Sequence, residues 1–263
     1  MTVGAGPLRI AAVGAAGRMG ERVRAAVTKD VGAILTGALE ADGHPDLGRT
    51  MDGVQLHSDP KLALEGANAV IDFSVPAATL PALRTAADLG IAYVCGTTGF
   101  TPEERAELEA AASRVPLVWA PNFSVAVNVL IHLVGEAARR LPDFDAEIVE
   151  LHHAAKRDAP SGTALRLGEA VARARGQDPD SIRVLERAGE TGARPAGAVG
   201  IQALRGGDNP GEHTVMLVGR GERLELVHRA ATRDHFAAGA LRAAHWARGR
   251  APGLYAMEQV LGL

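Results

Sequence analysis

The first half of the chain alternates short apolar runs with segments of helical pattern, and this alternation limits the folds open to it. Each run is apolar along nearly its whole length, as expected of strands buried on both faces. One intervening helix is predicted to begin at Thr101, with Pro102 in its first turn and Glu104 completing a capping box. The pattern predicts a doubly wound parallel sheet with strands at residues 8–14, 33–40, 69–74, 91–96 and 116–122.

The pattern changes after a predicted helix at residues 124–140. Strands are predicted at residues 146–153, around 183–188 and 197–205, and at 213–219 and 223–231, the last two forming an antiparallel hairpin. A helix at about 162–175 interrupts them, and the last 30 residues return to helix. The chain is therefore predicted to be α/β with two domains: a Rossmann-like domain of residues 1–124 with 234–263, and an α+β domain of residues 125–233 with a mixed or antiparallel sheet. The Gly/Pro-rich stretch 189–212 is interpreted as a loop or lid.

Composition narrows the class of protein. The 263 residues are 47% hydrophobic and 22% charged, with a net charge of −3, which is typical of a soluble globular protein. No basic run or tail suggests a nucleic-acid or membrane partner. Cys95 is the one cysteine, so no internal disulfide can form and a reducing, cytoplasmic location is expected. The first nine residues lack a secretory signal layout, and no segment is long and apolar enough to span a bilayer.

A glycine turn, "VGAAGRMG" (13–20), lies between the first predicted strand and helix. Glycines there let backbone N–H groups approach a pyrophosphate at a helix N-terminus. Because Ala16 takes the place of the usual second glycine, the turn alone is weak evidence, and a structural turn explains it nearly as well. Glu40, which ends the second strand where an acid binds ribose hydroxyls, strengthens the nucleotide interpretation.

Glu40 also bears on the choice of cofactor. Its carboxylate would repel a 2′-phosphate, and the next residue is Ala41 instead of a basic residue. The sequence therefore favours NADH. Arg18, inside the glycine turn, can still reach a 2′-phosphate, so use of NADPH stays open.

Two further stretches, "CGTTGF" (95–100) and "APNFS" (120–124), follow predicted strands. Ligands of open α/β sheets bind at the carboxyl ends of the strands, so both stretches are candidates to contact a nicotinamide. Ordinary turns and the N-caps of the following helices, at Thr101 and Ser124, explain them equally well. Cys95 is interpreted as a packing residue and not as a nucleophile.

The stretch "ELHHAAKRDAPSGTAL" (150–165) gathers groups that transfer protons and bind anions. Ser161 is a natural N-cap for the following helix, whose start, with Lys156 and Arg157 nearby, suits a substrate carboxylate. His152, His153 and Lys156 are candidates for proton transfer. A metal site is disfavoured, because adjacent strand residues point to opposite faces and no third ligand has fitting spacing. A solvated basic loop is the alternative.

This stretch resembles the signature of the 4-hydroxy-tetrahydrodipicolinate reductase (dihydrodipicolinate reductase) family. The resemblance implies a role in the diaminopimelate pathway of lysine biosynthesis. The resemblance continues through "VGAAGRMG", "VIDFS", "CGTTGF", "APNFSVAVN", "GEHTV" and "GLYAMEQVL". It implies an oxidoreductase with a cofactor domain, and a substrate domain whose sheet builds a homotetramer. It also implies hydride transfer from NADH or NADPH to a small dicarboxylate.

The resemblance also assigns residues. It implies His152 as the catalytic histidine and Lys156 as the proton donor, with substrate bound by His153, Ser161, Gly162, Thr163 and Arg233. For the cofactor it implies Gly14, Ala15, Ala16, Gly17, Arg18, Met19, Glu40, Gly96, Thr97, Thr98, Ala120, Pro121, Asn122 and Phe123. Ala41 departs from members with a basic residue there, which weakens the case for NADPH.

Two other functions fit parts of the sequence. A nicotinamide-dependent dehydrogenase of a small amino acid such as aspartate would share the glycine turn, but has no need of the whole stretch 150–165. A dinucleotide-binding sensor without activity would be expected to lose His152 or Lys156, and this chain keeps both.

Overall fold

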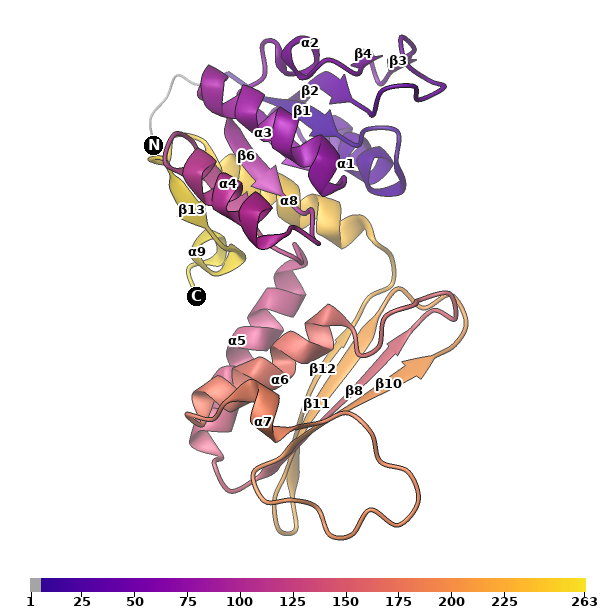
Figure 1. The fold of residues 1–263 in the computed structure, drawn as a ribbon, viewed down its shortest axis with the longest axis vertical. Coiled ribbons are helices and arrows are strands. Elements are labelled where there is room, and N and C mark those ends of the chain that lie inside the picture. Colours follow the sequence, from indigo (N-terminus) through magenta and orange to yellow (C-terminus); the bar gives the residue numbers. More distant parts are fainter. Residues whose placement is uncertain (1–5) are drawn as a thin grey trace. The chain divides into compact units, whose positions relative to one another are not determined.

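The computed structural model describes residues 6–263 and divides into two compact units (Figure 1). The first unit contains the described residues up to Val125 together with Asp234–Leu263. The second unit is Ala126–Arg233. Among the described helices, none is long and apolar enough to cross a membrane.

The first unit is built on an eight-stranded sheet with the order β13-β7-β6-β5-β1-β2-β4-β3. Its central strands all pair in parallel, which confirms the doubly wound sheet predicted from the sequence. The chain runs outward from β1 through β2 and then returns to β5 on the other side of β1. The five predicted strands are confirmed as β1 (Leu8–Val13), β2 (Ala33–Leu39), β5 (Ala69–Asp72), β6 (Ala92–Cys95) and β7 (Pro116–Trp119).

Helices cover both faces of this sheet. One apolar cluster joins the sheet to α1 (Arg18–Lys29) and α8 (Asp234–Ala247), so the end of the chain packs beside its first helix. A second cluster joins the other face to α2 (Pro60–Leu64), α3 (Pro76–Leu89) and α4 (Pro102–Ala112). The predicted capping box of α4 is confirmed, because the Thr101 hydroxyl accepts from the Glu104 N–H and the Glu104 carboxylate accepts from the Thr101 N–H.

The sequence analysis missed the edges of this sheet. Strands β3 (Thr50–Met51) and β4 (Val54–His57) extend one edge, and β13 (Gly253–Tyr255) extends the other, followed by the short helix α9 (Met257–Leu261). Each of these strands has four residues or fewer. Segments this short carry too little periodicity to be recognised.

The second unit has a mixed five-stranded sheet, in the order β12-β11-β8-β10-β9. β8 (Asp145–His152) lies at its centre, parallel to β10 (Val199–Arg205) and antiparallel to β11 (Glu212–Val218). β11 and β12 (Arg223–Arg229) form the predicted antiparallel hairpin. Side chains of β8 alternate between buried and partly exposed, as expected of a sheet covered on one face only.

Two helices cover the buried face of this second sheet (Figure 1). They are α5 (Val125–Arg140) and α6 (Gly162–Ala174), both predicted, and α7 (Pro179–Ile182) follows α6. Apolar side chains of α5 and α6 pack with Ile148, Ile201 and Val215 of the sheet. The strand predicted at 183–188 is reduced to the two residues of β9 (Arg183–Val184).

β10 confirms the strand predicted at residues 197–205, so the stretch 189–212 is not the one continuous loop or lid that its Gly and Pro content suggested. β10 crosses it at residues 199–205, because Val199 and Ile201 alternate on the buried face and pair in register with β8. Irregular segments remain on either side of β10, at residues 185–198 and 206–211.

Candidate active site

In the first unit, the predicted cofactor residues all follow the carboxyl ends of strands. The glycine turn follows β1, and Glu40 follows β2. Gly96 to Thr98 follow β6, and Ala120 to Phe123 follow β7. In a doubly wound sheet this is the edge at which ligands bind, next to the point where the strand order reverses.

The glycine turn brings the start of α1 close to the end of β1. At Gly20, an added Cβ would lie 2.1 Å from the Gly14 carbonyl oxygen, so only glycine lets the helix pack this closely. Gly17 is the N-cap of α1, and no side chain caps the helix there. An uncapped helix start beside a tight glycine turn is a suitable cradle for a pyrophosphate.

Glu40 is held against this turn. Its carboxylate accepts hydrogen bonds from the Ala16 N–H and the Ala41 N–H, both at 3.1 Å. The neighbouring Ala15 N–H donates to the Leu39 carbonyl at 3.1 Å, which ties the turn to the end of β2. The acid predicted to bind ribose is therefore fixed beside the residues predicted to bind phosphate.

A buried polar cluster fixes the segment after β6. Asp72, fully buried, accepts hydrogen bonds from the Tyr93 hydroxyl at 2.7 Å and the Ser74 hydroxyl at 2.6 Å. The Thr97 hydroxyl lies 2.9 Å from that of Thr79 and 3.3 Å from Asp72. Burial raises the pKa of Asp72, and the hydroxyl hydrogen bonds oppose that rise. Thr97 is thus a support of the segment and points its side chain inward, whereas Thr98 is exposed.

The segment after β7 likewise contains one buried residue and one exposed residue among those predicted to bind the cofactor. Phe123 is fully buried and packs edge-to-face against Phe73 at 5.6 Å between ring centroids. Pro121 is exposed. Of the residues predicted in this segment, Pro121 is therefore accessible, whereas Phe123 holds the segment in place.

Cys95 has the environment of a packing residue. Its side chain is fully buried, and burial raises the pKa of its thiol above the ordinary value, with the charge of Asp72 adding to the rise. A thiol that stays protonated and inaccessible is not a nucleophile. The sequence interpretation of Cys95 is confirmed.

In the second unit, the candidate catalytic residues lie where β8 ends. His152 is the last residue of β8, and it is buried on the face covered by the helices. His153 follows the strand, and its N–H donates to the Asn209 carbonyl at 2.8 Å. Because the strand has ended, the two histidines are not forced onto opposite faces of the sheet.

Glu150 lies beneath His152 on the same face of β8, and it is fully buried. One carboxylate oxygen contacts Nδ1 of His152 and accepts from Arg205 at 2.9 Å. The other accepts from Arg205 at 3.0 Å and from the Ser161 N–H at 3.0 Å. The carboxylate therefore joins the end of β8, the end of β10 and the start of α6.

The environment sets the charge states of this pair. Burial alone would raise the pKa of Glu150, but hydrogen bonds from Arg205, His152 and the Ser161 N–H outweigh it and hold that pKa below its usual value. For His152, burial together with the charges of Lys156 and Arg205 lowers the pKa despite the contact with Glu150. At neutral pH the pair therefore consists of an ionised carboxylate and a neutral imidazole.

Lys156 is held by a residue that the sequence analysis did not consider. Its ammonium group lies 2.7 and 2.8 Å from the two carboxylate oxygens of Asp158. Lys156 is largely covered, whereas the Asp158 side chain is 65% exposed. Arg205 also donates to the Asp158 carbonyl at 2.6 Å, which anchors the loop that carries Lys156.

Ser161 caps α6 as predicted. Its hydroxyl accepts from the Ala164 N–H at 3.2 Å and lies 3.2 Å from Nε2 of His213. Ser161 is buried and its N–H is bound to Glu150, whereas Gly162 is exposed. Burial lowers the pKa of His213 to about 3, so this ring is neutral at physiological pH. The exposed helix start at Gly162 is the accessible part of the predicted carboxylate site.

His153 and Arg233 come together although 80 residues separate them. The guanidinium of Arg233 lies 3.1 Å from Nε2 of His153. Since arginine only donates, Nε2 of His153 is the acceptor. The structure thus brings Arg233 next to His153, which follows the end of β8.

Sequence reasoning missed Glu150, Arg205, Asp158 and His213. A signal existed for Glu150, because a strand places residues i and i+2 on one face and this puts Glu150 with His152. Arg205 and His213 reach the site through strand pairing, with Arg205 opposite His152 in the register. No local pattern shows such a pairing.

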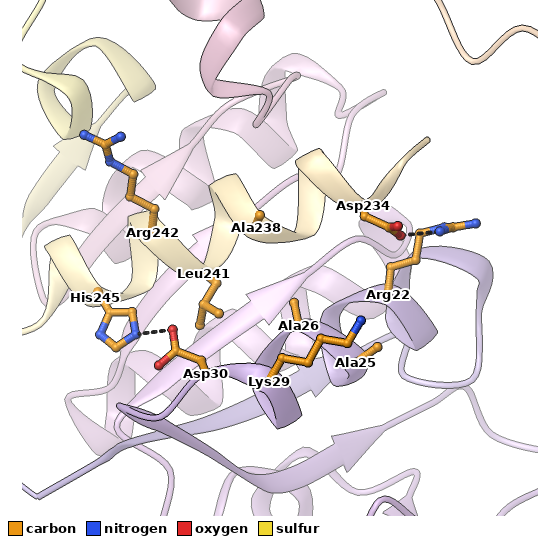
Figure 2. Close-up of a pocket in the computed structure, with 10 residues that line it drawn as sticks. All are labelled: Arg22, Ala25, Ala26, Lys29, Asp30, Asp234, Ala238, Leu241, Arg242 and His245. Carbon is orange, nitrogen blue, oxygen red and sulfur yellow. Dashed lines mark hydrogen bonds and ion pairs between the residues drawn. The ribbon is translucent and has the colours of Figure 1, made fainter. Parts of the chain in front are cut away.

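A pocket of about 590 Å³ lies elsewhere in the first unit, between α1 and α8 (Figure 2). Four of its charged side chains form two pairs, Arg22 with Asp234, and His245 with Asp30 at 3.2 Å. It contains none of the predicted site residues. Within residues 6–263, no group of three His, Cys, Asp or Glu side chains is arranged to hold a metal ion.

Comparisons with known proteins cover both units. Residues 8–123 match the family model described as "Dihydrodipicolinate reductase, N-terminus", and residues 126–261 match that described as "Dihydrodipicolinate reductase, C-terminus". A 4-hydroxy-tetrahydrodipicolinate reductase from Anaeromyxobacter sp. (strain Fw109-5) is 49% identical, with 97% of this chain and 98% of the relative covered. One from Geotalea daltonii is 47% identical, with 97% and 99% covered.

Solved structures agree on the fold. A dipicolinate-bound dihydrodipicolinate reductase from Paenisporosarcina sp. TG-14 superposes with a TM-score of 0.81 at 24% identity, covering 97% of this chain and 100% of that one. A probable dehydrogenase from Thermotoga maritima gives a TM-score of 0.61 at 13% identity, covering 97% and 93%.

Proposed function

The chain belongs to the dihydrodipicolinate reductase family, and we propose that it reduces 4-hydroxy-tetrahydrodipicolinate to tetrahydrodipicolinate in the diaminopimelate route to lysine. The family and the Rossmann-like sheet imply a nicotinamide cofactor, which makes the protein an NAD(P)H-dependent oxidoreductase. The observation that carries the proposal is the cluster at the end of β8, where His152, His153 and Lys156 stand beside the start of α6.

The first unit is proposed to hold the cofactor. The uncapped start of α1 and the close packing at Gly20 fit a pyrophosphate, which supports binding by the backbone at Arg18 and Met19. Gly14 to Gly17 are proposed to shape the turn, since the N–H groups of Ala15, Ala16 and Gly17 donate within the protein. The segments 96–98 and 120–123 are proposed to flank the nicotinamide. In them Thr98 and Pro121 are the exposed members, while Thr97 and Phe123 hold the segments in place.

The position of Glu40 supports NADH as the preferred cofactor. Its carboxylate is fixed beside Ala16 at the end of β2, where it would accept a hydrogen bond from a ribose hydroxyl but would repel a 2′-phosphate. The exposed Ala41 adds no positive charge to offset this repulsion. Arg18 is exposed in the turn and is the cation through which NADPH would be used at a lower rate.

The second unit is proposed to bind the dicarboxylate. One carboxylate would be bound at the start of α6, at Gly162 and Thr163, whose geometry Ser161 fixes as the N-cap. The second would be bound by Arg233 and His153, which already lie 3.1 Å apart.

The overall reaction removes a hydroxyl from the substrate and adds hydrogen. First, the substrate loses water. The hydroxyl leaves C4, a proton leaves the ring carbon between C4 and the imine, and a conjugated imine remains. When bound, the reduced nicotinamide supplies a hydride to C4. A proton then returns to the adjacent carbon and restores the imine. The overall reaction therefore consumes one hydride and one proton from solvent, and it releases one water. The chain must therefore take up one proton from carbon, protonate the leaving hydroxyl and return a proton to carbon.

Lys156 is proposed as the proton donor in this sequence. Its ammonium is held in place by the exposed Asp158, and the incoming substrate would replace that carboxylate. His152 acts beside it, in proton transfer and in stabilising developing charge. A positioned acid or base contributes roughly 10²–10⁴ to the rate.

The second sheet also supports the proposed homotetramer. Its face opposite α5 and α6 carries apolar side chains that no described segment covers, in particular Leu204, which is 52% exposed, and Val227, which is 41% exposed. Val149, Leu151 and Met216 lie on the same face by strand register and alternation. We propose that a second copy of the chain covers this face.

Sedimentation velocity of the wild type and of Val227→Glu tests this proposal. A wild-type monomer would contradict it.

A coupled assay tests the proposed function. Dihydrodipicolinate synthase would generate the unstable substrate, and oxidation of NADH or NADPH would be followed at 340 nm. We expect rapid oxidation only when the synthase is present, and faster oxidation with NADH. Absence of oxidation with either cofactor, from folded protein that binds NADH, would contradict the proposal and favour another dehydrogenase activity or a sensor.

A further inference from the structure

Glu150 is a buried carboxylate for which the proposed reaction has so far no use. It is fully buried at the centre of the second sheet, two residues before His152 on the same strand. Replacing such a buried ionic group by an apolar one is often neutral or stabilising in other proteins, so its presence calls for a reason other than stability.

Every group in contact with the Glu150 carboxylate either is a hydrogen-bond donor or can act as one. The backbone N–H of Ser161 and the two guanidinium nitrogens of Arg205 only donate. Nδ1 of His152 is the remaining contact and the only one that can change its role. Since an ionised carboxylate only accepts, Nδ1 of His152 must carry a proton.

The other ring nitrogen of His152 is then fixed as well. Burial keeps the ring neutral, so Nε2 holds a lone pair. No hydrogen bond to Nε2 is found among residues 6–263. Space beside Nε2 is kept open at Gly211, where an added Cβ would lie 2.8 Å from Nε2. The charged and titratable groups around the ring are Glu150, Lys156, Arg205 and His213.

We propose that Glu150 is a positioning residue that locks His152 in the tautomer with Nδ1 protonated, so that Nε2 faces the substrate as a proton acceptor. This inference rests on the proposed function and assigns separate proton transfers to His152 and Lys156. Nε2 of His152 takes the proton from the ring carbon beside the imine, and the Lys156 ammonium donates to the leaving hydroxyl. The proton held by His152 then returns to the same carbon after hydride addition.

Glu150→Gln tests the proposal, because an amide has only one acceptor oxygen. That oxygen satisfies either the Ser161 side or the His152 side of the site, but not both. The backbone N–H of Ser161 cannot become an acceptor, whereas His152 can change its tautomer. We therefore expect the amide NH₂ to face Nδ1 and the proton of His152 to move to Nε2.

The primary readout is the ¹⁵N spectrum of histidine-labelled full-length protein at neutral pH, with His152 assigned by its loss in His152→Asn. We expect the Nδ1–H tautomer in the wild type and the Nε2–H tautomer in Glu150→Gln. This readout requires no turnover, so it separates the inference from the proposed function. A wild-type His152 protonated at Nε2 would overturn the inference even if the enzyme is active.

Kinetics provide the second readout. We expect Glu150→Gln to lower kcat by roughly 10²-fold with little change in the KM for NADH. Glu150→Asp keeps the carboxylate, so it should retain the Nδ1–H tautomer and recover part of the rate. If Glu150→Gln does not fold, the wild-type spectrum and Glu150→Asp still decide the question.

Glu147→Gln is the matched control. Glu147 is on the same strand and is also paired with arginine, in its case Arg187 and Arg194, but it contacts no histidine among the described residues. The control should leave both kcat and the His152 tautomer unchanged. An equal loss of kcat in both variants, or an unchanged tautomer in folded Glu150→Gln, would overturn the inference.

Discussion

Glu150 and His152 stand two residues apart on β8, and their side chains meet on the buried face of the sheet. This contact connects the strand, through Arg205 and Ser161, to the loop of Lys156 and the start of α6. The residues proposed to transfer protons and those proposed to bind carboxylates therefore share one support. Changes within this support should therefore affect turnover.

Removing the proposed donor should affect chemistry and not cofactor binding. For Lys156→Ala we expect kcat to fall by roughly 10²–10⁴-fold, because no other ammonium is held at this place. Affinity for NADH, measured by fluorescence titration, should stay the same. An exposed arginine on α6 outside the proposed site provides the control, and Arg173→Ala should keep most of the activity. Unchanged turnover in Lys156→Ala would remove Lys156 from the mechanism.

Asp158 should oppose the binding of an anionic substrate. Its hydrogen bonds to Lys156 hold the pKa of Asp158 below its usual value, so it remains ionised when the substrate arrives. Asp158→Asn should lower the KM for the dicarboxylate several-fold, consistent with about 1 kcal/mol of charge repulsion in a partly solvated site. Asp180→Asn, an exposed acid on α7, should leave KM unchanged. A higher or unchanged KM for Asp158→Asn would argue against this competition.

Gly211 should be intolerant of a side chain. Its φ of +147° is one that L side chains rarely adopt, and a Cβ would lie 2.8 Å from Nε2 of His152. Gly211→Ala should therefore displace His152 and lower kcat by at least tenfold in steady-state assays. Gly206→Ala is the comparison, since a Cβ there meets no atom within 4 Å. Equal kinetics of the two variants would show that the space beside Nε2 is not needed.

His213 should make the fold sensitive to acid. Burial lowers its pKa to about 3 from an ordinary value of 6.5, so the unfolded chain binds more protons than the folded chain between these values. The stability associated with neutral His213 is complete above pH 6.5 and is lost as the pH falls toward 3. From pH 7 to pH 5 the free energy of unfolding should fall by about 2 kcal/mol from this residue alone.

Urea unfolding at the two pH values measures this loss in the wild type and in His213→Gln. The difference between pH 7 and pH 5 should be smaller in His213→Gln by that amount. His132→Gln, on the exposed surface of α5, should behave as the wild type does. The same pH dependence in all three proteins would contradict the assignment to His213.

Cofactor preference should respond to the charge after β2. Ala41→Arg places a guanidinium beside Glu40 at the exposed edge, where it can pair with a 2′-phosphate. We expect kcat/KM with NADPH to rise at least tenfold relative to that with NADH. Ala41→Gln is the neutral control. If the wild type already prefers NADPH, the interpretation of Glu40 is wrong.

Much of the fold could be predicted from the sequence, because the strands of the first sheet are buried on both faces and read as continuous apolar runs. Edge strands such as β13 are short and half-exposed, so no pattern marks them. The candidate site divides in the same way. Local motifs single out His152, Lys156 and Ser161 as candidates, and these lie within ten residues of each other in the chain.

The partners of these residues come from distant parts of the chain. Arg205 meets Glu150 because β10 pairs with β8, and His213 meets Ser161 because β11 pairs on the other side. Arg233 reaches His153 over 80 residues. The register of strand pairing decides these contacts, and the sequence shows register only through the alternation of buried residues.

The most direct test of the proposed reaction follows the transferred hydrogen. NADH deuterated at both C4 positions would be supplied to the enzyme with the synthase-generated substrate, and the product would be examined by mass spectrometry and NMR. One deuterium at C4 of tetrahydrodipicolinate, absent without the enzyme, is the predicted result. Oxidation of NADH that leaves no deuterium in the ring would contradict the proposed function.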